Sequence, residues 1–517
     1  MTHVVIIGGG HNGLAAAFYL GRAGLKPIVL ETRAACGGGA VTSELHPGFR
    51  CPALSHHTPL WSGVARDMEL ARHGLELLRP GVEAFTPSLD GPPLVLHRDA
   101  RQAADAIRRV NTADAEAYPE YRMAMGRIAG VLASLLQSPP PDIDHPGARD
   151  LWNLLKTARQ FRALDKRSRY RLLRWGPMPV ADLAREWFRS ELLCASIAGP
   201  AVSGTMLGPR SAGSGLVLLL HEATRLLADG PWQPRGGPGA LAQAMASAAA
   251  AAGADIRTST RVDQIVVAED RVAAVIAGGR RIDADAVISA IDPKSTFLTL
   301  MDPADLAPEF LAKIRNYRAA GTLAKVNLAL SGVPSFAAPS EWLAGRIHIG
   351  PHMDYLERAF DQAKYGEFSE QPWLDITVPS VLDPDLAPAG AHVMSIYAHY
   401  APHRLRGADW TAAKAPPLRN VLVTLERFAP GIAALVVAAD VITPADLESE
   451  YGLYGGHVYH GELAPDQIAT MRPLLGHARY ASPVPGLYMC SAGTHPGGFM
   501  TGASGKLAAR EILRSMT

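Results

Sequence analysis

Cysteine is scarce in this 517-residue chain, which contains only Cys36, Cys51, Cys194 and Cys490. No two of them are spaced as C-x-x-C, so the redox dithiol motif is missing, and four cysteines are too few for a secreted disulfide scaffold. No set of histidine, cysteine and aspartate residues has the spacing of metal ligands, and we expect no metal. We therefore expect a reduced, cytoplasmic protein that is not secreted.

An excess of charge of one sign is also missing, because 50 Lys and Arg residues face 49 Asp and Glu residues. The resulting net charge of +1 provides no general basic field to attract phosphate backbones, which argues against a nucleic-acid partner. Local patches of charge are compatible with this balance.

Long hydrophobic runs are missing as well. The longest, at residues 214–220 and 240–252, are shorter than the roughly 20 apolar residues that span a bilayer. The first residues lack the basic stretch and apolar core of a signal peptide. No basic amphipathic helix stands out as a strong argument for membrane attachment, so a peripheral membrane contact is left open.

The first 31 residues have the order strand, turn, helix, strand. Residues 3–7 form a short β-branched run, three glycines interrupt it, and strong helix formers continue to Gly24. A second buried strand is predicted over residues 28–30, directly before Glu31. This order predicts one βαβ unit.

The pattern Gly8-x-Gly10-x-x-Gly13 lies between the first predicted strand and the helix, the context in which it indicates a dinucleotide site. Its glycines permit a tight turn, the approach of a pyrophosphate and close helix packing, and the helix N-terminus favours an anion. Glu31, 18 residues after Gly13, is placed to accept hydrogen bonds from a ribose. A turn without a ligand is the disfavoured alternative.

Two further glycine clusters favour FAD over NAD as the dinucleotide. One lies at residues 37–39, in CGGGAVTSE, and the other extends over residues 493–505 and leads into another predicted helix. A flavin bound in extended form needs backbone donors at both ends, whereas one βαβ crevice usually serves NAD. We therefore predict FAD as the cofactor.

The rest of the chain alternates between helical and strand patterns. Residues 65–230 are mostly helical by pattern, and residues 254–291 predict a hairpin followed by a buried strand. Residues 296–450 mix strands, helices and proline-rich loops. The final segment again has the order strand, glycine-rich loop, helix.

The combination of the first glycine motif, Glu31, the pair Gly37-Gly38 and the string GTHPGGFMTGASG resembles the FAD-dependent amine oxidase and phytoene desaturase superfamily. The strings GGGHNGLAAAFYL, ELARHGLELLRP and YHGELAPDQ resemble its phytoene dehydrogenase-like members in particular. The likeness extends over residues 3–514.

The resemblance implies an α/β fold class: a Rossmann-like FAD-binding domain, three-layered around a parallel sheet, with a discontinuous mixed α+β substrate domain. The FAD-binding domain would combine residues 1–80, 231–295 and 451–517. Residues 81–230 and 296–450 would form the substrate-binding or cap domain.

The resemblance also implies cofactor-binding residues at both ends of the chain. Gly8, Gly10 and Gly13 would contact the pyrophosphate and Glu31 the adenosine ribose, while the strand at Val262 would read the adenine edge. The remaining positions belong to the two other glycine clusters: Gly38, Gly39, Gly493, Met500, Thr501 and Gly502.

Four residues are candidates for the chemistry. Phe499 corresponds to a position that is often glycine in phytoene desaturases and aromatic in amine oxidases, and a plain core aromatic is the alternative. Lys325 is the only charge in the strand GTLAKVNLAL; it would act near the flavin, or it would be an edge-strand lysine that reaches solvent. His460 and Glu462 would face the cavity or complete a turn.

These residues lead to three functional hypotheses. The first is an FAD-dependent oxidoreductase that transfers a hydride between flavin N5 and a largely apolar substrate, in carotenoid- or isoprenoid-like desaturation, saturation or isomerisation. The second is an FAD-dependent amine oxidase. The third is a flavin-containing interaction protein with little turnover. The partners would be a small apolar or amine substrate and an electron acceptor, oxygen or a quinone.

Overall fold

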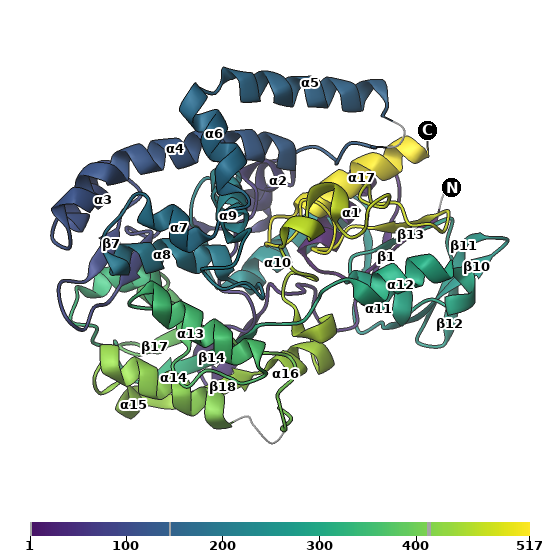
Figure 1. Ribbon diagram of the computed structural model, residues 1–517. Helices are drawn as coiled ribbons and strands as arrows, with labels where there is room; N and C mark the ends of the chain where they lie inside the picture. The colour runs from purple at the N-terminus through teal and green to yellow at the C-terminus, as the bar shows by residue number, and fades with distance from the viewer. Residues whose placement is uncertain (1–2, 144–145, 411–414, 517) are drawn as a thin grey trace.

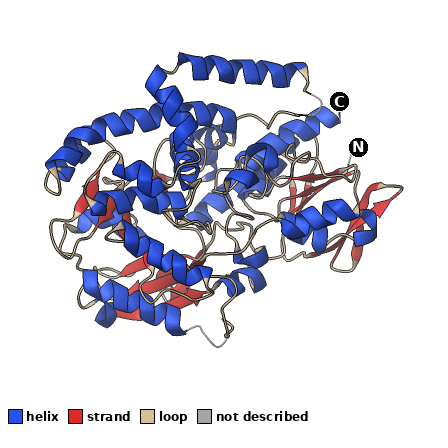
Figure 2. Cartoon of the chain, viewed as in Figure 1, coloured by secondary structure: helices blue, strands red, loops and turns tan. Residues whose placement is uncertain are grey.

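The computed structural model describes residues 3–143, 146–410 and 415–516 (Figure 1). Strands gather in two separate regions, and helices cover and connect them (Figure 2). Within the described residues, no helix is both long and apolar enough to cross a membrane.

A five-stranded sheet in which all neighbouring strands are parallel forms the first region. Its strands, in spatial order, are β19 (Leu487–Met489), β13 (Ala286–Ser289), β1 (Val4–Ile7), β2 (Ile28–Leu30) and β9 (Asp255–Arg257).

Alternating side chains of β1 explain why this sheet has a layer on each face. Val4 and Ile6 pack on one face into a core formed with the helices α1 (His11–Arg22), α10 (Pro238–Ala251) and α17 (Ala503–Ser515). Val5 and Ile7 pack on the other face against the antiparallel strands β10 (Val262–Ala268), β11 (Arg271–Ala277) and β12 (Arg280–Asp283). The predicted α/β class, with three layers around a parallel sheet, is confirmed.

The five parallel strands come from three distant parts of the chain: residues 4–30, 255–289 and 487–489. Each part lies within one of the three segments assigned to the FAD-binding domain from the sequence. The domain boundaries themselves stay a prediction.

A seven-stranded mixed sheet forms the second region. Its spatial order is β18 (Val436–Ile442), β14 (Leu323–Leu330), β17 (His392–His399), β16 (Trp373–Thr377), β15 (Arg346–Ile349), β6 (Ala84–Thr86) and β7 (Leu94–Leu96).

Lys325 lies in β14, a strand that has a partner on both sides, and its side chain is 1% exposed. The alternative of an edge-strand lysine that reaches solvent is therefore wrong.

Helices fill the predicted helical region, although the short strands β5 (Leu77–Leu78), β6 and β7 interrupt its beginning. Its helices are α2 (Ser62–Asp67), α3 (Ala100–Ile107), α4 (Thr112–Leu136), α5 (Ala148–Ala163), α6 (Lys166–Trp175), α7 (Val180–Arg185), α8 (Glu191–Val202) and α9 (Ser214–Ala228). The other elements are β3 (Thr42–His46), β4 (Phe49–Pro52), β8 (Gln233–Pro234), α11 (Pro293–Leu298), α12 (Pro308–Asn316), α13 (Met353–Lys364), α14 (Ala415–Phe428), α15 (Ile432–Leu435) and α16 (Pro444–Ser449).

Candidate functional site

The turn between β1 and α1 depends on its glycines. Gly8 has a φ of +98°, which favours glycine. A Cβ atom on Gly13 would lie 2.1 Å from the carbonyl oxygen of Gly8, so only glycine allows the helix to pack this closely on the turn. Gly10 caps α1 without a side chain, which leaves the first N–H groups of the helix free to bind an anion.

The carboxylate of Glu31 is held beside this turn. It is buried at the end of β2 and accepts hydrogen bonds from the backbone N–H groups of Gly9, at 2.8 Å, and Arg33, at 2.9 Å. A carboxylate oxygen can accept more than one hydrogen bond, so Glu31 can still receive a ribose hydroxyl.

The second glycine cluster packs directly against the first. Gly37 pairs with Gly10, and a Cβ atom on Gly38, whose φ is +59°, would lie 3.0 Å from the Cα atom of Gly10. Gly39 reaches the wall of a cavity, where a Cβ atom on it would lie 3.7 Å from the Cε atom of Met500.

The third cluster brings the other end of the chain to the same place. Gly502, with a φ of +70°, caps α17 without a side chain, and Thr501 Oγ1 accepts from the N–H of Ala503 at 3.2 Å. A Cβ atom on Gly505 would lie 2.0 Å from the carbonyl oxygen of Asn12, so the starts of α17 and α1 touch. Two helix N-termini therefore converge on one cradle.

For two other predicted cofactor residues, Gly493 and Val262, contact with the cofactor stays a prediction. A Cβ atom on Gly493 would lie 2.6 Å from Pro293 at the start of α11. Val262 begins β10, and its side chain packs in the core shared with Ile7 and Leu30.

The glycine turn, the open helix N-termini and Glu31 together fit a dinucleotide. They supply backbone donors and a ribose acceptor, and no side chain of the described residues fills the space between them.

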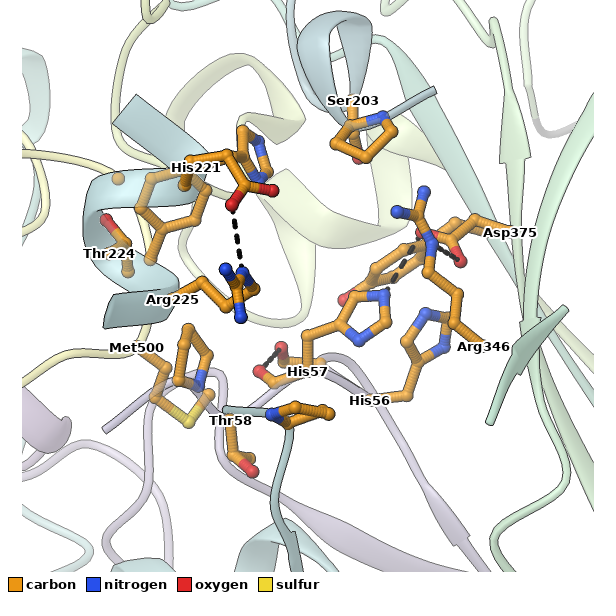
Figure 3. Close-up of a pocket in the computed structure, with 18 of the residues that line it drawn as sticks. His56, His57, Thr58, Ser203, His221, Thr224, Arg225, Arg346, Asp375 and Met500 are labelled. Atoms are coloured by element: carbon orange, nitrogen blue, oxygen red, sulfur yellow. Dashed lines mark hydrogen bonds and ion pairs between the residues drawn. The ribbon is translucent and has the colours of Figure 1, made fainter. Parts of the chain in front are cut away.

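A cavity of about 360 Å³ adjoins the cradle at Gly39 and Met500 (Figure 3). Its walls come from both regions of the fold, and the cavity combines apolar and aromatic surface with several ionisable groups. The lining residues used below are His11, His56, His57, Glu83, Arg122, His221, Glu222, Arg225, Arg346, Asp375, Tyr397, Tyr459, His460 and Phe499.

On the side of the seven-stranded sheet, the charges are paired around Asp375. Its carboxylate lies 2.6 Å from Arg346 Nε and 3.1 Å from His57 Nε2 (Figure 3). Burial opposes ionisation of Asp375, but Arg346 and His57 nevertheless hold its pKa well below the usual range. Asp375 therefore carries a full negative charge that its neighbours neutralise.

The charges on the helical side of the cavity are also paired. Glu222 lies 3.0 Å from Arg225 and 3.5 Å from Arg122, and Arg225 also reaches Glu83 at 3.4 Å. Burial opposes ionisation of Glu222, yet the two arginines lower its pKa. The cavity therefore holds three arginines balanced by three carboxylates.

Four partly buried histidines that line the cavity add no charge near neutral pH. Burial lowers the pKa of His221 and His460 to about 3 and that of His11 to about 4. Burial, together with the nearby Lys325, brings the pKa of His56 well below its usual value. These four imidazoles are consequently neutral donors and acceptors.

Lys325 lies behind His56 and is separated from the cavity by it. Its Nζ atom is 3.1 Å from His56 Nδ1, forms a short contact with Ser395 Oγ, and lies 4.8 Å from the centre of the Tyr397 ring. Burial lowers the pKa of Lys325 to about 7. His56 Nε2 is buried and has no hydrogen-bond partner among the described residues.

The other three predicted catalytic residues have different positions. Phe499 is part of the cavity wall, with its ring centre 4.4 Å from that of His221 and 5.2 Å from that of Tyr459. His460 also lines the cavity. Glu462 does not: its carboxylate binds Arg318 Nε at 2.7 Å. The structure thus brings Phe499 and His460 together, places Lys325 behind His56, and leaves Glu462 in a structural ion pair.

His56, His57 and Asp375 form a set of three potential metal ligands, with ligand atoms within 4.8 Å of one another. The sequence pattern did not show this set. Arg346 already binds the Asp375 carboxylate, and Lys325 binds His56. The guanidinium of Arg346 opposes a divalent cation at this place, so the structure does not favour a metal there.

Sequence reasoning missed the residues that face one another across the cavity, above all Asp375, Arg346 and His221. Asp375 is the only charged residue in the buried strand WLDIT. The same pattern drew attention to Lys325, so it could have identified Asp375 as well.

Known proteins match this chain over most of its length. The model of the family described as flavin containing amine oxidoreductase matches residues 13–403. Pyridine nucleotide-disulfide oxidoreductase domain-containing protein 2 of Rattus norvegicus is 36% identical, over 99% of this chain and 93% of its own length. A limonene dehydrogenase polypeptide of Castellaniella defragrans is 24% identical, over 99% and 94% of the two chains. The lycopene-forming phytoene desaturase of Pseudescherichia vulneris is 31% identical over 59% of this chain and 60% of its own.

Among solved structures, a triple mutant of putrescine oxidase matches this fold with a TM-score of 0.62, over 99% of both chains. Its sequence identity is 18%. At this identity, the likeness concerns the fold and not the substrate.

Proposed function

Because the chain belongs to the flavin containing amine oxidoreductase family, we propose that it transfers a hydride between FAD and a carbon of an uncharged, largely apolar substrate. The protein is an FAD-dependent oxidoreductase. Desaturation of an isoprenoid-like chain is the reaction that fits this proposal best, and oxygen or a quinone is proposed as the final electron acceptor.

The glycine cradle would hold the cofactor. Gly8, Gly10 and Gly13, with the start of α1, would bind the pyrophosphate, and Glu31 would bind the ribose. Met500, Thr501 and the start of α17 would lie beside the flavin ring. When bound, FAD supplies a hydride acceptor at N5.

One observation carries the choice of substrate: every carboxylate that lines the cavity is bound by an arginine. Asp375 is bound by Arg346, and Glu222 and Glu83 by Arg225. A substrate ammonium group would therefore meet no free carboxylate, whereas an uncharged substrate loses little by leaving water. The names of two relatives, limonene dehydrogenase and phytoene desaturase, support the same choice.

His56 and Lys325 would handle the proton of the reaction. Forming a C=C bond removes a hydride from one carbon and a proton from its neighbour. In this proposal substrate binding brings the reacting carbon to the buried Nε2 atom of His56. Nε2 takes the proton, and Nδ1 passes its own proton to the neutral amine of Lys325, 3.1 Å away. The transfer is favourable because the pKa of Lys325, about 7, lies above that of the His56 imidazole.

Amine oxidation is the second candidate, and one observation favours it. The rings of Tyr397, Tyr459 and Phe499 all line the cavity, and aromatic faces attract cations. The family's description also includes amines.

Anaerobic reduction of the purified holoenzyme separates the candidates. We expect limonene or a phytoene-like polyene to bleach the flavin absorbance, while a panel of primary and secondary amines leaves it unchanged. Bleaching by amines alone would replace the first candidate with the second. If no compound in either set reduced the flavin, both would be contradicted and the interaction-protein hypothesis would gain.

A further inference from the structure

Helix α5 lies along the outer edge of the molecule, at the top of Figure 1, and α6 leads back from its end. Apart from Asp150, none of the described side chains of α5 is buried. Asp150 ties the start of the helix to the body through an ion pair with Arg479, at 2.8 Å. Most side chains of α5 are therefore accessible to solvent and are not covered by the rest of the protein.

The apolar face of α5 points away from the protein. Leu151 is 56% exposed, Trp152 61% and Leu155 45%. These three positions are spaced as neighbours on a helix surface. Among the described side chains of α5, the partly covered ones are Asn153, Thr157, Gln160 and Phe161, of which only Phe161 is apolar.

This arrangement is the reverse of the usual one, in which a surface helix turns its apolar stripe toward the core. An isolated helix of this length is only marginally stable in water. The 16 residues of α5 would therefore gain stability from a partner that covers the outward apolar face.

The same segment is strongly basic. Residues 151–175 contain eight Lys or Arg residues and one Asp, a net charge of +7, whereas the whole chain has +1. Lys156, Arg159 and Arg162 are exposed on α5 beside the apolar face. On α6, Leu173 is 65% exposed, and the exposed Lys166 and Arg167 precede it, while its neighbour Arg174 is paired with Glu186.

We propose that α5 and α6 dock the protein on an anionic membrane surface, with Leu151, Trp152 and Leu155 in the boundary between headgroups and acyl chains. A helix with aromatic and aliphatic residues on one face and flanking basic residues suits this position. A second copy of the chain fits less well, because a symmetric contact would bring two segments of +7 together.

The sequence analysis left a peripheral membrane contact open, because no basic amphipathic helix stood out as a strong argument for it. Leu151, Trp152 and Leu155 could equally well form the buried stripe of an ordinary helix, and the sequence does not say which face is covered. Only the position of α5 in the fold shows that the stripe is outward.

Vesicle flotation of the holoprotein tests the proposal. We expect it to float with vesicles of phosphatidylglycerol and phosphatidylcholine in equal parts and to stay behind with phosphatidylcholine alone. The variant Leu151→Gln/Trp152→Gln/Leu155→Gln should lower the partition coefficient by about tenfold or more. Lys156→Gln/Arg159→Gln/Arg162→Gln should lower it similarly and weaken its dependence on salt.

Val423→Gln on α14 is the matched control, since Val423 is also an exposed apolar residue, 58% exposed, on another helix. It should float like the natural protein. Circular dichroism and flavin absorbance should be the same for all variants, because every changed side chain is exposed. Lack of binding to the anionic vesicles would overturn the proposal. A natural dimer that the triple apolar variant converts to a monomer would overturn it in favour of a second copy.

Discussion

Lys325 and His56 are hydrogen-bonded to each other, with Nζ 3.1 Å from Nδ1, although 269 positions separate them in the chain. The pair joins strand β14 of the seven-stranded sheet to the cavity wall. Because His56 lines the cavity and Lys325 does not, a proton can pass from the cavity to the lysine through this imidazole.

The pH dependence of flavin reduction should reveal this pair. Lys325 can accept a proton only as the neutral amine, so the reduction rate of the natural enzyme should rise as the pH increases through about 7. Lys325→Met should lose this rise and slow the step by about 100-fold, a usual range for general base catalysis. Anaerobic stopped-flow reduction measures both effects. Lys364→Met, at an exposed position on α13, should retain the rise, and an unchanged profile in Lys325→Met would exclude the proton relay.

Lys325 should also make stability depend on pH. Its folded pKa of about 7 lies below the usual 10.5, so between these values the unfolded state binds more protons and stability rises with pH. Lys325→Met should therefore be more stable than the natural protein at pH 7, and this advantage should shrink as the pH approaches 10. Melting temperatures of the two proteins across this range provide the comparison. Parallel curves would contradict the lowered pKa.

Gly10→Ala should separate cofactor binding from folding. Its backbone has a φ of −75°, which alanine adopts, and the nearest neighbour of the new Cβ atom would be Gly38 Cα at 3.6 Å. The methyl group would project into the cradle, so we expect FAD retention to fall by about tenfold or more while the apoprotein melts as before. FAD released on dilution can be measured by fluorescence. Gly63→Ala, with open space around it, should retain the cofactor; if both variants lost it equally, the cradle would be wrongly assigned.

Asp375→Asn should destabilise the protein strongly. It leaves Arg346 and His57 without their buried counter-charge, and breaking such a pair costs about 3–5 kcal/mol. Because the pKa of Asp375 is held well below its usual value, this stabilisation should persist through neutral pH and disappear only as strong acid protonates the carboxylate. Urea denaturation at several pH values measures it. Asp361→Asn, in an exposed ion pair with Lys364, should change stability by less than about 1 kcal/mol.

The cofactor cradle was predictable because its features are local in sequence. Gly8, Gly10 and Gly13 define a turn and a helix start within six residues. The role of each glycine follows from backbone geometry alone. The parallel sheet and its three layers follow from the same unit and from the family resemblance.

The cavity was much less predictable, because its chemistry depends on strand order. Asp375 meets Arg346 only because β16 pairs with β15, and Lys325 meets Ser395 only because β14 pairs with β17. The spacing of these residues in the sequence does not indicate which strands pair with each other. For the same reason the sequence could not show that His460 lines the cavity whereas Glu462 does not. Glu462 is bound by Arg318, which is 144 positions away in the chain.

The contact between the starts of α1 and α17 joins two segments that lie far apart in the sequence. Gly505 packs against Asn12, 493 positions away, and strand β19 joins the parallel sheet beside β13. Contacts between distant segments form slowly during folding, because a long loop has to close first. The second helix N-terminus of the cradle should therefore be among the last parts of the fold to assemble.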